Sequence, residues 1–138
     1  MPNHFHFLIK QTTDRGIALF MQRFINSYVH YYNVKYKRVG PLFQGPFKNV
    51  LIYSDEQLLH VSRYIHLNPL VAGLVSNLDN YPWSSYLNYT GNSNNNFLNP
   101  NLVLANFKSK EDYKQFVLDQ KDYGRSLELL KHEIDFCT

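Results

Sequence analysis

The chain has 138 residues, which suits one folded domain, and 44% of them are hydrophobic and 18% charged, ordinary values for a folded protein. It contains no run of about eighteen apolar residues that could span a membrane and no layout typical of a signal peptide, so we expect a cytoplasmic protein without a membrane partner. The one cysteine, Cys137, excludes a disulfide framework and a cysteine-based zinc site.

Basic residues are concentrated in the first part of the chain. Residues 1–53 carry a net charge of +6, with Asp14 as the one acid, whereas residues 54–138 carry −3. A basic half indicates a polyanionic partner, of which nucleic acid is the commonest. Ordinary unevenness of surface charge explains the same counts equally well.

The N-terminal stretch "MPNHFHFLIK" places two histidines one residue apart. In a β-strand side chains alternate between faces, so His4 and His6 would point the same way from positions roughly 6–7 Å apart. Two imidazoles can reach one metal ion across that gap, with bonds of about 2.1 Å each. The stretch therefore predicts a two-histidine metal clamp or, more commonly, a triplet without function on the solvent face of an edge strand.

The next segments predict a helix, a loop and a second strand. Aromatic and aliphatic residues recur at helical spacing over 16–33, after candidate caps at Thr12, Thr13 and Asp14. Glycine and proline interrupt "KYKRVGPLFQG", which predicts a loop. Residues 47–52 are rich in β-branched and aromatic side chains and predict a strand.

A second helix is predicted from Ser54, because this residue and Gln57 have the spacing of a capping box. It should end near Asn68, since a residue before proline disfavours helical geometry. Further on, Trp83 is expected to anchor its segment to the core. The amide-rich residues 90–96 predict a loop, followed by two helices, the second capped by Ser109 with Tyr113, Phe116 and Val117 facing inward.

Two residues of the second predicted helix have side chains that suit chemistry. Tyr64 and Asn68 lie four residues apart and so share one helix face, beside an apolar stripe. Taken singly, such a tyrosine is more often a packing residue, and an asparagine at a helix end is more often a cap. The interpretation therefore depends on their combination with the histidine pair.

Four motifs together, "MPNHFHFLI", "GPLFQGPFK", "SRYIHLNPLVAGLV" and "YPWSSY", closely resemble the REP-associated tyrosine transposases, a branch of the single-tyrosine HUH transposase superfamily. The resemblance runs from Met1 to about Tyr89. It implies an α+β fold, a ferredoxin-like (RRM-like) antiparallel sheet with helices on one face, over a catalytic domain of residues 1–89. Residues 90–138 would form a loop and a helical C-terminal tail.

The resemblance also implies that a segment is missing. Members of that family carry a strand and a helix before the "MPNH" motif, whereas this chain begins inside it. We therefore expect a fragment, a misassigned start, or a sheet whose exposed edge pairs with a second copy to form a dimer.

In that family the histidine pair and an amide bind a divalent ion, and a tyrosine attacks the DNA. The residues at these positions are His4, His6 and Asn68 for the metal and Tyr64 for the nucleophile. The ion would be Mg²⁺ or Mn²⁺, which accept nitrogen and oxygen ligands and polarise a phosphate. The resemblance thus implies an endonuclease and strand transferase acting on single-stranded DNA at hairpin-forming repeats, through a 5′-phosphotyrosine.

Basic residues of the motifs are candidate phosphate contacts: Lys35, Lys37, Arg38, Lys48 and Arg63. Two other functions remain open. One is a catalytically inactive, truncated relative that only binds DNA. The other is a metal hydrolase in which His4 and His6 activate water, although no carboxylate base stands beside them.

Overall fold

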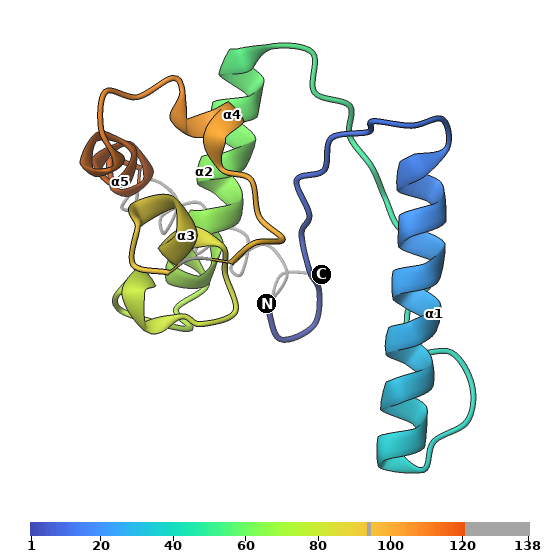
Figure 1. The fold of residues 1–138 in the computed structure, drawn as a ribbon. Helices are drawn as coiled ribbons and strands as arrows, with labels where there is room; N and C mark the ends of the chain where they lie inside the picture. The colour runs from blue at the N-terminus through green and yellow to red at the C-terminus, as the bar shows by residue number, and fades with distance from the viewer. Residues whose placement is uncertain (94, 121–138) are drawn as a thin grey trace, which may run out of the picture. The chain divides into compact units, whose positions relative to one another are not determined.

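The computed structural model describes residues 1–93 and 95–120, and these form helices connected by loops (Figure 1). Their order is α1 (Gly16–Tyr36), α2 (Asp55–Val71), the 3₁₀ helix η1 (Leu78–Asn80), α3 (Tyr86–Thr90), α4 (Asn101–Leu104) and α5 (Lys110–Leu118). Two compact units divide the chain. Within its described part, the first unit combines residues 1–6 with 52–93 and 95–120, and the second is residues 7–51.

The predicted ferredoxin-like sheet is wrong, because no β-strand occurs among residues 1–93 and 95–120. Both segments expected as strands, the histidine segment and residues 47–52, lack regular secondary structure. A strand exists only when its backbone N–H and C=O groups pair with a neighbouring strand, so side-chain alternation alone does not create one. The sheet edge through which we expected a dimer is therefore also absent from this part of the chain.

Helix α2 begins as the sequence predicts. Ser54 has extended backbone angles, and its Oγ accepts a hydrogen bond from the Gln57 backbone N–H at 3.1 Å. The Gln57 side chain reaches back and accepts from the N–H of Tyr53 at 2.9 Å. The first bond occupies one of the backbone donors that a helix start leaves without an intrahelical partner, and the second satisfies the N–H of the residue before the cap.

The predicted end of α2 near Asn68 is wrong, since the helix continues through Pro69 to Val71. A proline inside a helix removes one backbone hydrogen bond and crowds the carbonyl four residues earlier. Pro69 is buried and Leu70 is 1% exposed, so apolar burial at this end of the helix offsets part of that cost. Backbone bonds from Ala72 to Asn68 and from Gly73 to Leu70 then close the helix. Asn68 consequently lies inside the last turn instead of capping it.

The core of the first unit forms where α5 packs against α2 and α3. The hydroxyl of Tyr113, which is fully buried, lies 2.6 Å from Ser62 Oγ and 2.6 Å from His66 Nδ1. The other ring nitrogen of His66 lies 2.8 Å from Ser85 Oγ. The cap at Ser109 and the burial of Tyr113 and Val117 confirm the prediction for this last helix, whereas Phe116, also expected to face inward, is half-buried.

Trp83 does not anchor the core, contrary to the prediction, because its side chain is 83% exposed. Tyr86 and Tyr89 of α3 take that place, with exposed fractions of 1% and 8%. Both rings contact the His66 imidazole edge-on. Trp83 and Tyr86 are only three positions apart, so composition could not distinguish which of the two rings turns inward.

The second unit consists of α1 and the irregular segment that follows it. The helix begins at Gly16 as predicted but extends to Tyr36, beyond the expected end at residue 33. None of the three candidate caps closes its start, where Arg15 has a left-handed backbone and the Gln11 side chain accepts from the N–H of Ile17. Neither this helix nor any other in the described ranges is long and apolar enough to cross a membrane.

Candidate functional site

The four residues expected to act together all lie in the first unit. His4 and His6 belong to its irregular N-terminal segment, and Tyr64 and Asn68 lie on one face of α2. Helical geometry places Tyr64 and Asn68 one turn apart. Because α2 is fixed to the core by its buried residues, it gives these two side chains a rigid base.

Asn68 and His6 are in direct contact. The Asn68 Nδ2 atom lies 3.2 Å from His6 Nε2, so the amide donates and the imidazole accepts when the ring proton is on Nδ1. The two ends of an amide are exchangeable by a flip of its plane, which would present Oδ1 to the same space. Ligand atoms on one octahedral ion are about 3.0 Å apart, close to this separation.

His4 is oriented by its neighbour Asn3. Their Nδ1 and Oδ1 atoms are 2.7 Å apart, and since the amide oxygen can only accept, the imidazole donates. The proton is thereby held on Nδ1, and Nε2 keeps a lone pair for a metal. The sequence reasoning overlooked Asn3, although an amide next to a candidate ligand histidine was a usable signal.

The two imidazoles have the spacing that a shared ion requires. Their ring centroids are 4.9 Å apart, with an angle of 81° between the planes. Imidazoles bound to one ion through nitrogens at about 2.1 Å have centroids roughly 4.5–5.5 Å apart when the bond angle is near 90–110°. Two imidazole nitrogens and an amide oxygen therefore fit a divalent ion such as Mn²⁺ or Mg²⁺.

Burial lowers the pKa of His6, and the neighbouring His4 and the N-terminal ammonium lower it further. A lowered pKa favours the neutral ring, which is the form that binds a metal. Among the described residues no group of three or more His, Cys, Asp or Glu side chains could hold a metal. The metal ligands proposed from the sequence are two histidines and an asparagine. They do not form such a group because asparagine is not one of these four residue types.

Tyr64 stands next to the same imidazole. Its ring centroid is 5.5 Å from that of His6, edge to face, and its side chain is 58% exposed. The phenol thus borders the histidine pair and remains open to solvent. His6 thus contacts both Tyr64 and Asn68.

The other polar residues of this face of α2 are engaged in local contacts. Arg63 Nη2 donates to His60 Nδ1 at 2.6 Å, and its guanidinium lies 4.3 Å from the Phe116 ring centroid. Arg63 is 7% exposed, and burial lowers its pKa. These contacts favour a packing role for Arg63, and phosphate binding by it stays a prediction.

The remaining candidate phosphate contacts, Lys35, Lys37, Arg38 and Lys48, are exposed residues of the second unit. Lys35 Nζ donates to Tyr31 Oη at 3.2 Å, and this bond raises the pKa of Lys35. Lys37 follows α1 in a left-handed conformation. Asp14 is the one acid among residues 7–51, so this unit carries an excess of basic residues.

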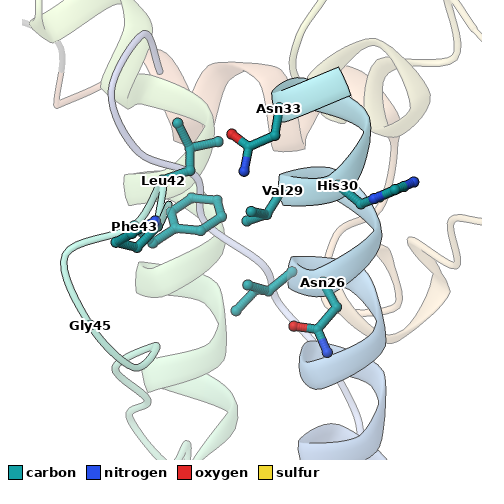
Figure 2. Close-up of a pocket in the computed structure, with 9 residues that line it drawn as sticks. Asn26, Val29, His30, Asn33, Leu42, Phe43 and Gly45 are labelled. Atoms are coloured by element: carbon teal, nitrogen blue, oxygen red, sulfur yellow. The ribbon is translucent and has the colours of Figure 1, made fainter. Parts of the chain in front are cut away.

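The second unit also contains an open hollow of about 530 Å³ between α1 and the loop after it (Figure 2). Asn33 bridges the two walls by donating through Nδ2 to the carbonyl of Gly40 at 3.0 Å. In the close-up, Val29 and Asn33 point toward the loop whereas the His30 ring points away. The residues lining the hollow are Ile25, Asn26, Val29, His30, Asn33, Pro41, Leu42, Phe43 and Gly45.

Comparisons with known proteins gave no match to a protein-family model, to a curated protein or to a solved structure.

Proposed function

We propose that this protein cleaves and rejoins single-stranded DNA with Tyr64 as the nucleophile and with a divalent metal ion held by His4, His6 and Asn68. The observation that carries the proposal is that His6 contacts both the phenol of Tyr64 and the amide of Asn68. The four motifs that resemble REP-associated tyrosine transposases support the same assignment. Hairpin-forming repeats are the proposed substrate.

The step assigned to Tyr64 is the transfer of a DNA phosphoryl group. The Tyr64 Oη attacks phosphorus, the bond from phosphorus to the 3′ oxygen breaks, and the released 3′-hydroxyl takes up a proton while the phenol gives its proton to water. A 5′-phosphotyrosine then joins the protein to the downstream strand. When bound, the ion supplies electrostatic stabilisation of the phosphate. Attack by a 3′-hydroxyl on the phosphotyrosine reverses the step and rejoins the DNA.

The residues around Tyr64 orient its side chain and do not take its proton. His60, one turn earlier on α2, accepts from Arg63 through Nδ1, and its Nε2 is 3.8 Å from Glu56 Oε1. Both ring nitrogens thus have partners away from the phenol. Exposure of the Tyr64 side chain leaves its proton to solvent, which is why we assign no side-chain base.

The test uses a library of single strands in which a hairpin is flanked by randomised sequence and the 3′ end carries the label. Incubation with Mn²⁺ should transfer the label to the protein in a complex that survives denaturant. Tyr64→Phe should abolish this product, whereas Tyr53→Phe, at a ring that is 83% exposed, should preserve it. Absence of any labelled protein would refute the proposal.

Two other results would replace the proposed function with a different one. Salt-sensitive binding without a covalent product would identify the protein as an inactive DNA-binding relative. Cleavage that persists in Tyr64→Phe would identify a hydrolase that uses water in place of the phenol.

A further inference from the structure

A row of aromatic rings follows one side of α1 within the second unit. Spacing of four residues places one ring on each successive turn, with Phe20, Phe24, Tyr28, Tyr32 and Tyr36 as its members. Consecutive ring centroids are 5.9, 6.4, 6.2 and 4.5 Å apart. The first three rings are nearly parallel, with angles of 15° and 13° between neighbours. We call these five residues the ring ladder.

Three of the five rings of the ring ladder are exposed to solvent, whereas Phe24 and Tyr32 are half-buried. Phe20 is 46% exposed, Tyr28 43% and Tyr36 54%, and the adjacent Tyr31 is 57% exposed. An amphipathic helix normally buries such a stripe, and a contiguous exposed apolar patch marks an interaction surface. The question is therefore what binds there.

The positive charges beside the ring ladder indicate which class of ligand binds there. Helix α1 contains Arg23 and Lys35 and no acidic residue. Lys35 Nζ lies 5.4 Å from the centroid of Tyr36, and the Arg38 guanidinium carbon lies 5.7 Å from that of Tyr32. Cations placed among exposed rings are typical of surfaces that bind unpaired nucleic acid strands. Two copies of this face would bring cations against cations, which disfavours self-association.

We propose that the ring ladder is a binding face for single-stranded DNA, on which unpaired bases stack while Lys35 and Arg38 contact phosphates. From Phe20 to Tyr36 the row is about 24 Å long at a rise of 1.5 Å per residue. That length suits a site of several nucleotides, within the range of roughly 4–16 that single-strand binding folds cover. The choice of DNA rests on the proposed function, but this binding needs neither the metal nor the Tyr64 phenol.

The test measures binding of a fluorescein-labelled deoxythymidine strand by fluorescence anisotropy, using the full chain with Tyr64→Phe and with EDTA present. Replacing two ladder rings, Tyr28→Leu with Tyr36→Leu, should weaken binding by at least about tenfold, because each stacked base is lost with its ring. Replacing the same residues by phenylalanine keeps the rings and should keep the affinity. Val34→Ala removes exposed aliphatic surface from the same helix and should leave binding unchanged.

Unchanged affinity in the leucine pair would overturn the proposal, as would tighter binding to a duplex of the same length, whose bases are not free to stack. Light scattering that shows a dimer, dissociated by the leucine pair, would assign the face to a second copy instead. Circular dichroism checks that each variant folds. These outcomes differ from failure of the proposed function, which would remove the covalent product and leave this binding intact.

A second measurement avoids ring substitutions altogether. Photocrosslinking of a strand that carries 5-iododeoxyuridine to Tyr64→Phe protein, followed by trypsin digestion, should modify the peptide of residues 24–35, which contains Phe24, Tyr28 and Tyr32. Adducts confined to peptides outside α1 would overturn the proposal.

Discussion

The Asn68 side-chain amide lies 3.2 Å from Nε2 of His6, although 62 positions separate the two residues in the chain. Asn68 reaches this place because α2 continues through Pro69, which keeps its side chain on the same helix face as Tyr64. A helix that ended before Pro69 would have left Asn68 free to turn toward the backbone as a cap. The continuation of α2 is thus the feature of the fold that positions the proposed metal ligand.

We expect Asn68→Ala to weaken Mn²⁺ binding, measured by titration calorimetry, by at least about tenfold, because one oxygen ligand is removed. Asn68→Asp retains an oxygen at the same position and adds a negative charge, so it should bind the ion at least as tightly. The matched control is Asn96→Ala, at an exposed asparagine of the loop before α4. Equal Mn²⁺ affinity in Asn68→Ala and the unaltered chain would exclude Asn68 as a ligand.

Removal of the metal should stop the covalent reaction with DNA and leave DNA binding intact. With EDTA, formation of the covalent DNA complex should stop, because the scissile phosphate loses its charge stabilisation. Binding of a single strand should persist, since it depends on the basic second unit, and should fall as salt rises. Electrophoresis under denaturing conditions reports the first quantity and anisotropy the second. A covalent product formed at full yield in EDTA would remove the metal from the proposed chemistry.

Part of the site could be predicted from the sequence and part could not. Helical periodicity was enough to place Tyr64 and Asn68 on one face, because a spacing of four residues fixes their relation. The position of His6 beside them depended on long-range packing, which only the resemblance anticipated. Its expected support, a β-sheet, is absent from residues 1–93 and 95–120, since pairing between strands has no local signal that guarantees it.

The features of the secondary structure were likewise predicted correctly in some places and wrongly in others. The caps at Ser54 and Ser109 were predicted correctly because a serine hydroxyl acts on an N–H only three residues away. The end of α2 and the orientation of Trp83 were predicted wrongly, because both depend on which side chains are buried against distant parts of the chain. Pro69 is buried while Trp83 is exposed, the reverse of what their residue types suggest.

Tyr113→Phe should destabilise the first unit by about 1–3 kcal/mol, because it removes one hydroxyl from between two buried polar partners. Ser62 Oγ and His66 Nδ1 each lie 2.6 Å from that hydroxyl and would lose it together. Urea unfolding followed by circular dichroism measures the change. Tyr53→Phe removes an exposed hydroxyl and should leave the free energy of unfolding unaltered. Unchanged stability of Tyr113→Phe would show that the hydroxyl contributes nothing to the core.

Stability should fall as the solution is acidified, because burial lowers the pKa of His66 to about 4 from an ordinary value of 6.5. Between these two pH values the unfolded chain binds a proton that the folded chain does not. The free energy of unfolding therefore declines as pH falls through this window, by up to about 3 kcal/mol, and the loss is complete below the folded pKa. Well above pH 6.5 His66 is neutral in both states and contributes no slope.

The titratable groups that face His66 do not contribute to this pH dependence. The phenols of Tyr86, Tyr89 and Tyr113 face the imidazole, and burial raises their pKa values, so they stay neutral throughout the window. Urea titrations at successive pH values should show a smaller slope in His66→Gln, whose amide does not titrate. His30→Gln, at an exposed histidine of α1, should retain the slope of the unaltered chain. Equal slopes in both variants would mean that His66 is not the group that titrates.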